Sequence, residues 1–323
     1  MIELKQDRYL VSIIIPIYNG ANYMREAIDS ALNQTYKNIE VLVVNDGSTD
    51  NGETDRIARS YGDKIRYFYK NNGGVSSALN YGISQMKGNY FSWLSHDDVY
   101  TLTKIEDQVK ALAKIGDDNL LCYCKDIHID KNSKIINTPF KINRLETDKV
   151  STWNSVLEDM LKYGIYNGCA FLIPRKVFFE DGLSFDENLR FSQDALMWYQ
   201  IFLKKYNLLC IHNIDVEGRV HSQQVTQTSQ SVFKKDSEYI CDKVLNAFIE
   251  NSTKEFNIIY YYIRFHAIHG NRNVVLKSLF KAKANKKLSS FQIFRIQAYR
   301  IYGKWRPFIR SVYYKLFKKI KTN

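Results

Sequence analysis

The sequence is poor in the residues that would commit it to a small disulfide-bonded or metal-stabilised fold. It has only five cysteines among 323 residues, and none of them shows the paired spacing of a structural metal site. Most of these cysteines fall inside apolar runs, which indicates burial. An odd number of cysteines, without a recognisable signal peptide, favours a reduced, cytosolic setting. The sequence therefore disfavours a secreted disulfide scaffold.

Long apolar runs are also missing, because no uninterrupted run reaches the roughly 20 residues that span a bilayer. The composition is that of a globular protein, with 45% hydrophobic and 25% charged residues. The length suits one large domain with an appendage or two modest ones.

Acidic residues are absent from one part of the chain. After Gly270 lie fifteen of the 46 Lys and Arg residues but none of the 34 Asp and Glu residues. The formal net charge of +12 therefore belongs to the tail, and the first 270 residues are slightly acidic. A basic segment predicts an anionic partner. Charge alone would allow nucleic acid, but no recognition module is visible, and we predict no nucleic-acid partner.

Short β-branched or aromatic runs alternate with helical patterns in the first hundred residues. This alternation predicts a mostly parallel α/β sheet with flanking helices and right-handed crossovers. The predicted strands are residues 11–17, 39–45, 64–69 and 90–94, and a helix follows each of the first three. Further along we expect a helix over 102–115 with Leu102 on its apolar face, a strand over 119–124, and a hairpin over 127–136 that turns at Lys131 and Asn132.

Polar residues follow each of the first four strands. They are Tyr18 and Asn19, then Asp46 to Ser48, then Asn71 to Gly74, then Ser95 to Asp98. In a parallel sheet these four ends lie on one edge, where open α/β sheets bind their ligands. The sequence therefore predicts one composite site built from distant segments.

Asp97 and Asp98 are neighbouring carboxylates at the end of a buried strand. Two such groups repel each other unless a cation lies between them, and a hard divalent ion with free positions for phosphate oxygens fits. The alternative is that they cap the helix that begins near Leu102.

Asp194 begins a helix that is apolar nearly all round, which predicts a buried helix whose first residue is held rigidly. As a simple N-cap, Asp194 would contribute about 1 kcal/mol of stability.

Four motifs together resemble family 2 glycosyltransferases of the GT-A fold. These are Pro16-Ile17-Tyr18-Asn19, Asn45-Asp46-Gly47-Ser48-Thr49-Asp50, Asn72-Gly73-Gly74-Val75 and Leu94-Ser95-His96-Asp97-Asp98. Their order and spacing match the family, over residues 11–227. The resemblance implies a GT-A, Rossmann-like fold and an inverting transfer of a sugar from a nucleotide diphosphate sugar, with UDP as the expected nucleotide.

The resemblance also implies roles for single residues. Asp194 would be the general base, and Asp97 would hold Mn²⁺ or Mg²⁺ on the diphosphate, with Asp98 beside it. His221, in an Arg-x-His segment, would complete the metal shell or contact the diphosphate; the alternative is a structural histidine. The implied nucleotide contacts are Pro16, Tyr18, Asn19, Asp46, Asn72, Gly73, Ser95 and His96.

Three positions depart from the family. Ser95 stands where an acid begins the Asp-x-Asp triplet, and Gln193 replaces the commoner glutamate before Asp194. Leu79 stands where many members have an arginine, so a phosphate or base contact expected there must be absent or supplied elsewhere.

We expect residues 1–230 to form the catalytic domain and 231–323 a helical, basic extension. Residues 306–323 combine Lys and Arg with an apolar stripe, which is typical of an interfacial membrane helix. Docking of this helix on its own domain is the alternative. An anionic membrane partner points to a cytoplasmic enzyme at the inner face of the cell membrane. Its acceptor would be a lipid-linked saccharide, in bacterial capsule or O-antigen synthesis.

Two other functions remain open. A nucleotidyltransferase shares the α/β design, but no Gly-rich basic loop follows the first strand. A non-catalytic binding protein on a decayed transferase would explain Ser95, although Asp46, Asp97 and Asp194 are all retained.

Overall fold

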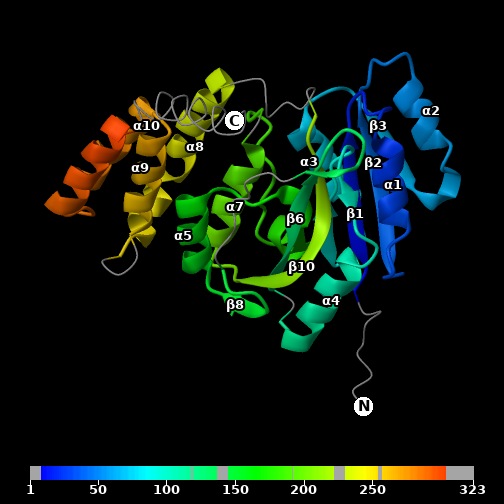
Figure 1. Cartoon of the computed structure of the whole chain (residues 1–323), viewed down its shortest axis with the longest axis horizontal. Coiled ribbons are helices and arrows are strands. Elements are labelled where there is room, and N and C mark those ends of the chain that lie inside the picture. The colour runs from blue at the N-terminus through cyan, green and yellow to red at the C-terminus, as the bar shows by residue number, and fades with distance from the viewer. Residues whose placement is uncertain are drawn as a thin grey trace, which may run out of the picture. The chain divides into compact units, whose positions relative to one another are not determined.

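A computed structural model describes residues 9–117, 119–136, 145–190, 192–221, 230–253 and 257–302 (Figure 1). Within it the chain divides into two compact units. The first comprises residues 1–159 and 163–229, and the second comprises residues 160–162 and 230–323. The predicted helix over 306–323 lies outside the described residues. No helix in the described part of the chain is long and apolar enough to cross a membrane.

The first unit is a mixed sheet with helices packed around it (Figure 1). Its strands run in the order β3-β2-β1-β4-β9-β6-β10-β5, with β7 on β6 and β8 on β10. The strands are β1 (Val11–Ile17), β2 (Ile39–Asp46), β3 (Arg66–Lys70), β4 (Tyr90–Trp93), β5 (Val99–Tyr100), β6 (Leu121–Ile129), β7 (Ile135–Ile136), β8 (Lys149–Ser151), β9 (Phe171–Pro174) and β10 (Leu208–Arg219). The helices of this unit are α1 (Met24–Leu32), α2 (Glu53–Arg59), α3 (Val75–Gln85), α4 (Lys104–Ile115), α6 (Lys176–Phe179), α7 (Gln193–Leu203) and most of α5 (Trp153–Tyr163), whose residues 160–162 belong to the second unit.

Strands β3, β2, β1 and β4 are parallel to one another. Val11 pairs with Ile39 and Ile17 with Asn45 along β1 and β2. Every residue of β1 is buried, because a strand in the interior of a parallel sheet is covered on both faces. The parallel sheet predicted for the first hundred residues is therefore confirmed, and it places four strand ends on one edge.

The sheet continues with strands of mixed direction. Strand β9 is antiparallel to both β4 and β6, while β6 and β10 are parallel. The predicted hairpin after β6 is confirmed, since Ile129 pairs with Ile135. Helix α7 is buried nearly all round, as its sequence predicts. Its Trp198 ring lies 4.3 Å from that of Phe171 on β9, so α7 packs directly on the sheet.

Several predicted boundaries differ from the structure, among them the strand predicted over 119–124, which is β6; two others differ for clear local reasons. Helix α4 begins at Lys104 and not at Leu102, whose side chain is 59% exposed. The Leu102 carbonyl accepts hydrogen bonds from the backbone and the hydroxyl of Thr35, which hold this segment outside the helix. Strand β3 begins at Arg66, because residues 62–64 form a short 3₁₀ turn.

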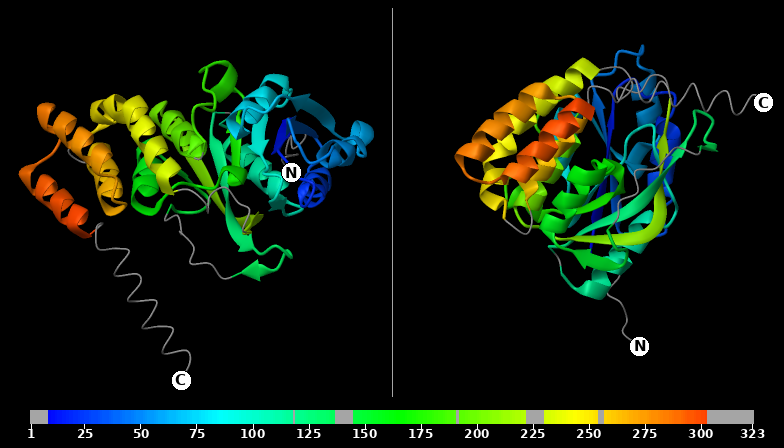
Figure 2. Two further views of the ribbon diagram at one scale, coloured as in Figure 1. Left: turned by 90° about the horizontal axis from the view of Figure 1, so that it is seen from above. Right: turned by 60° about the vertical axis from the view of Figure 1, so that its left-hand side comes forward.

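The second unit consists of helices that pack on one another (Figure 2). They are α8 (Gln230–Asn251), α9 (Ile258–Ile268), α10 (Arg272–Ala284) and a further helix over residues 290–302. Their inward positions are apolar, with Phe248, Tyr262, Val275 and Ile296 fully buried.

Candidate active site

The ends of β1 and β2 are joined by hydrogen bonds through polar side chains. The Asn19 amide N–H donates to the Ser48 hydroxyl (2.9 Å), and the Thr49 amide N–H donates to the Asn19 side-chain oxygen (2.7 Å). Asn19 has a φ of 50°, a left-handed conformation that asparagine tolerates. Pro16 is buried within β1, whereas the Tyr18 ring is exposed beside these loops. Tyr18 is therefore free to face a ligand at the sheet edge.

Asp46 organises the loop that follows β3. Its side chain is 2% exposed, forms an ion pair with Lys70 (2.7 Å), and accepts the backbone N–H groups of Gly73 (3.0 Å) and Gly74 (2.7 Å). Asn72 donates to the Asp46 carbonyl oxygen (2.9 Å). Asp46, Asn72 and Gly73 are thus brought together as the sequence predicts, and Asp46 builds this part of the site through bonds within the protein.

Gly47 is required beside Asp46, because its φ of 68° is left-handed and a Cβ would lie 2.6 Å from the Asn72 nitrogen. Lys70 is a site residue that the sequence analysis missed. Only its position at the last residue of a strand could have pointed to it.

The arginine missing at position 79 has no replacement within α3. Leu79 is fully buried in the core, and the next residue, Asn80, forms two hydrogen bonds with the backbone of Phe185 (2.8 and 2.9 Å). This pairing fixes the segment after Phe185 on α3. The segment carries Arg190, whose Nη1 lies 3.9 Å from the position that a Cβ of Gly74 would occupy. A guanidinium group therefore stands at the start of α3, supplied by a distant part of the chain.

Asp97 and His221 are in direct contact at the edge of the sheet. The Asp97 Oδ2 and His221 Nε2 atoms lie 3.1 Å apart, and both side chains are mostly buried. His96 packs against Gly20, where a Cβ would lie 2.7 Å from its Cδ2 atom. Burial lowers the pKa of His96 although the Asp97 charge opposes this, and the burial favours the neutral imidazole.

Asp98 points into the protein, which corrects the expectation that two carboxylates face each other at the rim. It accepts hydrogen bonds from the Arg219 backbone N–H (2.9 Å) and from the Cys169 thiol (3.3 Å). Burial, with the nearby Asp97 charge, raises the pKa of Asp98 to about 7. The alternative that these carboxylates cap the next helix is also wrong, because α4 has no side-chain cap.

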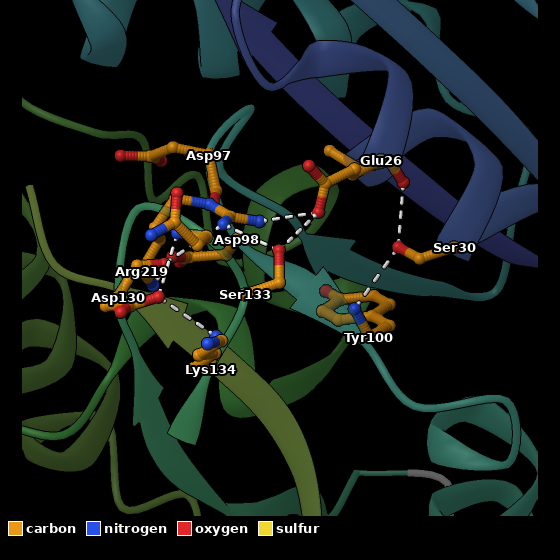
Figure 3. Close-up of polar contacts among 11 residues, drawn as sticks. Glu26, Ser30, Asp97, Asp98, Tyr100, Asp130, Ser133, Lys134 and Arg219 are labelled. Carbon is orange, nitrogen blue, oxygen red and sulfur yellow. Dashed lines mark hydrogen bonds and ion pairs between the residues drawn. The ribbon is translucent and has the colours of Figure 1, made fainter. Parts of the chain in front are cut away.

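Arg219 links the Asp97 turn to two other segments (Figure 3). Its side chain is fully buried, and its guanidinium donates to the Asp97 carbonyl (2.8 Å), the Ser133 hydroxyl (2.9 Å) and the Glu26 carboxylate (2.8 Å). The Tyr23 ring lies 4.5 Å from this guanidinium and 5.2 Å from the His221 ring. Arg219 thus holds the backbone of Asp97, while Tyr23 contacts the ring of His221.

The donor set fits a divalent ion that takes most of its ligands from substrate and water. Asp97 and His221 supply one oxygen and one nitrogen, and Mg²⁺ is commonly held by one or two carboxylates together with substrate phosphates. Among the residues that the structure describes, no group of three or more His, Cys, Asp or Glu side chains is arranged to hold a metal. The Ser95 hydroxyl accepts a hydrogen bond from the Cys169 thiol (3.4 Å).

Asp194 lies in the first turn of α7, and Ser192 precedes the helix at the N-cap position without a side-chain cap bond. The Asp194 Oδ1 atom accepts the N–H of Ala195 (2.8 Å). The neighbouring Gln193 is 8% exposed, and its amide oxygen has no hydrogen-bond partner among the described residues.

Comparison with known proteins extends this picture. The family model of Glycosyl transferase family 2 matches residues 12–180. An uncharacterized glycosyltransferase of Rickettsia typhi is 41% identical over 330 residues, which cover 99% of each chain. One of Rickettsia bellii is 49% identical over 257 residues, and this match spans 78% of the present chain but only 36% of that protein.

The crystal structure of S. aureus TarS 1–349 in complex with UDP-GlcNAc is similar in fold. The TM-score is 0.67 at 16% identity, over 93% of this chain and 91% of that one. The predicted GT-A fold, with helices after the sheet, is therefore confirmed.

Proposed function

The chain belongs to glycosyl transferase family 2, and from this premise we propose that it transfers a sugar from a UDP-sugar to an acceptor hydroxyl with inversion at the anomeric carbon. The convergence of four strand ends with the Asp97–His221 pair carries the proposal. The UDP moiety is supported by the similarity of fold to TarS, which was crystallised with UDP-GlcNAc. In this proposal, residues 1–230 form the catalytic domain and residues 231–323 form an extension.

The nucleotide lies at the edge formed by the ends of β1, β2 and β3. Tyr18 presents an exposed ring for the base, while Asn19 and Asn72 offer polar groups beside the buried Asp46–Lys70 pair. Ser95 and His96 continue this edge toward the diphosphate.

Asp97 and His221 would hold Mn²⁺ or Mg²⁺, and such an ion would supply positive charge against the departing diphosphate. Asp98 does not bind the ion directly in this proposal. Its two hydrogen bonds, to Arg219 and Cys169, hold the turn that carries Asp97.

Asp194 takes the proton of the acceptor hydroxyl as its oxygen attacks the anomeric carbon. The bond between that carbon and the diphosphate oxygen breaks on the opposite face of the sugar, and UDP leaves. A direct displacement of this kind needs one base and inverts the configuration.

The acceptor in this proposal is a lipid-linked saccharide at the inner face of a bacterial cell membrane, as in capsule or O-antigen synthesis. The excess of positive charge after Gly270 supports an anionic surface as the place of action.

The test is a screen of UDP-, GDP- and TDP-sugars for thermal stabilisation, with and without Mn²⁺. A ligand at a hundred times its dissociation constant adds about 2.7 kcal/mol to the free energy of unfolding. We expect a UDP-sugar to stabilise the protein more with Mn²⁺ than without it. Failure of every nucleotide sugar to do so would favour a non-catalytic protein on a transferase fold.

A further inference from the structure

Large apolar side chains are exposed on the last two described helices of the second unit. Within α10 and the helix over 290–302, Phe280 is 77% exposed, Phe294 70%, Phe291 66% and Ile301 63%. Scattered single apolar residues on a surface need no explanation, but a gathering of them over two consecutive helices does.

These side chains occupy one face of each helix. On α10, Leu276 and Phe280 are one turn apart, and Lys283 follows on the same face. On the next helix, Phe291, Phe294 and Ile301 are spaced by three and seven residues, which also places them on one face. We call these six residues the outer face.

The inward positions of the same helices are already filled. Val274, Val275, Leu279 and Ala282 of α10 are buried, as is Ile296 of the following helix. The outer face is therefore not needed for packing among the described residues. An amphipathic surface helix of a globular protein normally carries polar residues on that side.

The two helices that carry the outer face have only basic charges of their own. No Asp or Glu occurs after Gly270; Lys283 and Arg295 are exposed on these helices, and Lys286 is exposed in the turn between them. Two acids of α8 lie beside α10: Asp242 forms an ion pair with Lys277, and Glu238 accepts a hydrogen bond from Asn273 (2.9 Å). The surface is both apolar and basic.

We propose that the outer face docks on an anionic lipid surface, with the Phe, Leu and Ile side chains in the acyl boundary and the basic groups at lipid phosphates. Exposed Leu and Ile side chains distinguish this partner from nucleic acid, which offers them no apolar counterpart. The inference deepens the proposed function and rests on it, because it gives the enzyme a route to a lipid-linked acceptor.

The experiment measures sedimentation of the full chain with vesicles of phosphatidylglycerol mixed into phosphatidylcholine, and with phosphatidylcholine alone. We expect binding to the anionic vesicles, weakened but not abolished by high salt. A Phe280→Ser/Phe294→Ser variant should lose about tenfold in affinity per ring. A Lys283→Gln/Lys286→Gln variant should lose about fivefold per charge, and only at low salt.

Matched controls come from the first unit. Leu102→Ser removes an apolar side chain that is 59% exposed, and Arg56→Gln removes a charge whose side chain is 64% exposed. Neither should change vesicle binding. The phenylalanine variant should keep the wild-type melting temperature and UDP-sugar binding without vesicles, so that a failure of the inference is separable from a failure of the proposed function.

Equal binding of the wild type and the phenylalanine variant to anionic vesicles would overturn the inference. Equal binding of the wild type to anionic and to neutral vesicles would also overturn it. A wild-type dimer that the phenylalanine variant converts to a monomer, without vesicle binding by either, would instead assign the outer face to a second copy of the chain.

Discussion

Removal of the buried Arg219 guanidinium tests whether the Asp97 turn is held from within the protein. An Arg219→Met substitution keeps an unbranched apolar chain but deletes the donors to Asp97, Ser133 and Glu26. Breaking a buried ion pair costs about 3–5 kcal/mol. We expect the lower end, about 3 kcal/mol, because the Glu26 side chain is 49% exposed and water can replace its partner.

The assay is chemical denaturation of the variant, combined with UDP binding in the presence and absence of Mn²⁺. Loss of Arg219 should weaken Mn²⁺-dependent binding more than metal-independent binding, because Asp97 and His221 are the groups released. Arg219→Lys should recover part of the stability by restoring one donor. Arg56→Met removes an exposed arginine that is paired with Glu53, and should cost about 0.5 kcal/mol or less. A stability of Arg219→Met within 1 kcal/mol of wild type, with unchanged metal dependence, would refute this reasoning.

Three further predictions concern single side chains. Asp97→Asn should remove the metal dependence of UDP-sugar binding, measured by titration calorimetry, while the melting temperature stays near that of wild type; unchanged metal dependence would contradict it. Asp194→Asn should lower turnover about 10²–10⁴-fold with little change in donor affinity, since a general base accelerates the reaction by about that factor. Wild-type turnover in this variant would show that another residue is the base. Burial lowers the pKa of Lys104 to about 8. Between pH 8 and about 10.4 the unfolded chain therefore binds more protons than the folded protein. The free energy of unfolding should rise with pH by up to about 3 kcal/mol across that window. Lys104→Met should flatten this rise, and an equally steep rise in the variant would show that another group causes it.

The sheet edge was predictable because its signals are local. A β-branched run such as residues 11–17 reports burial on both faces, and the polar residues after each strand then fall on one edge by the geometry of a parallel sheet. The motifs around Asp46 and Asp97 lie at such ends, so their approximate place followed from the sequence.

The direction of single side chains was not predictable in the same way. Asp98 lies in a turn, which lacks the helical or strand repeat that tells which side chains point inward. Its partners Arg219 and Cys169 come from other parts of the chain. The position of Lys70 depends on its ion pair with Asp46, and that of Arg190 on the fold that brings its guanidinium near Gly74. The start of α4 is set by Thr35, which is 67 residues away from Leu102 in the chain.

The anomeric configuration of the product formed from an α-linked UDP-sugar tests the proposed reaction most directly. Proton NMR of a reaction with Mn²⁺ and a soluble saccharide acceptor distinguishes the two anomers as they form. The proposed displacement, with Asp194 as the only base, predicts a β-linked product and equal release of UDP, both lost in Asp194→Asn. An α-linked product, or the same product from Asp194→Asn at the wild-type rate, would contradict it.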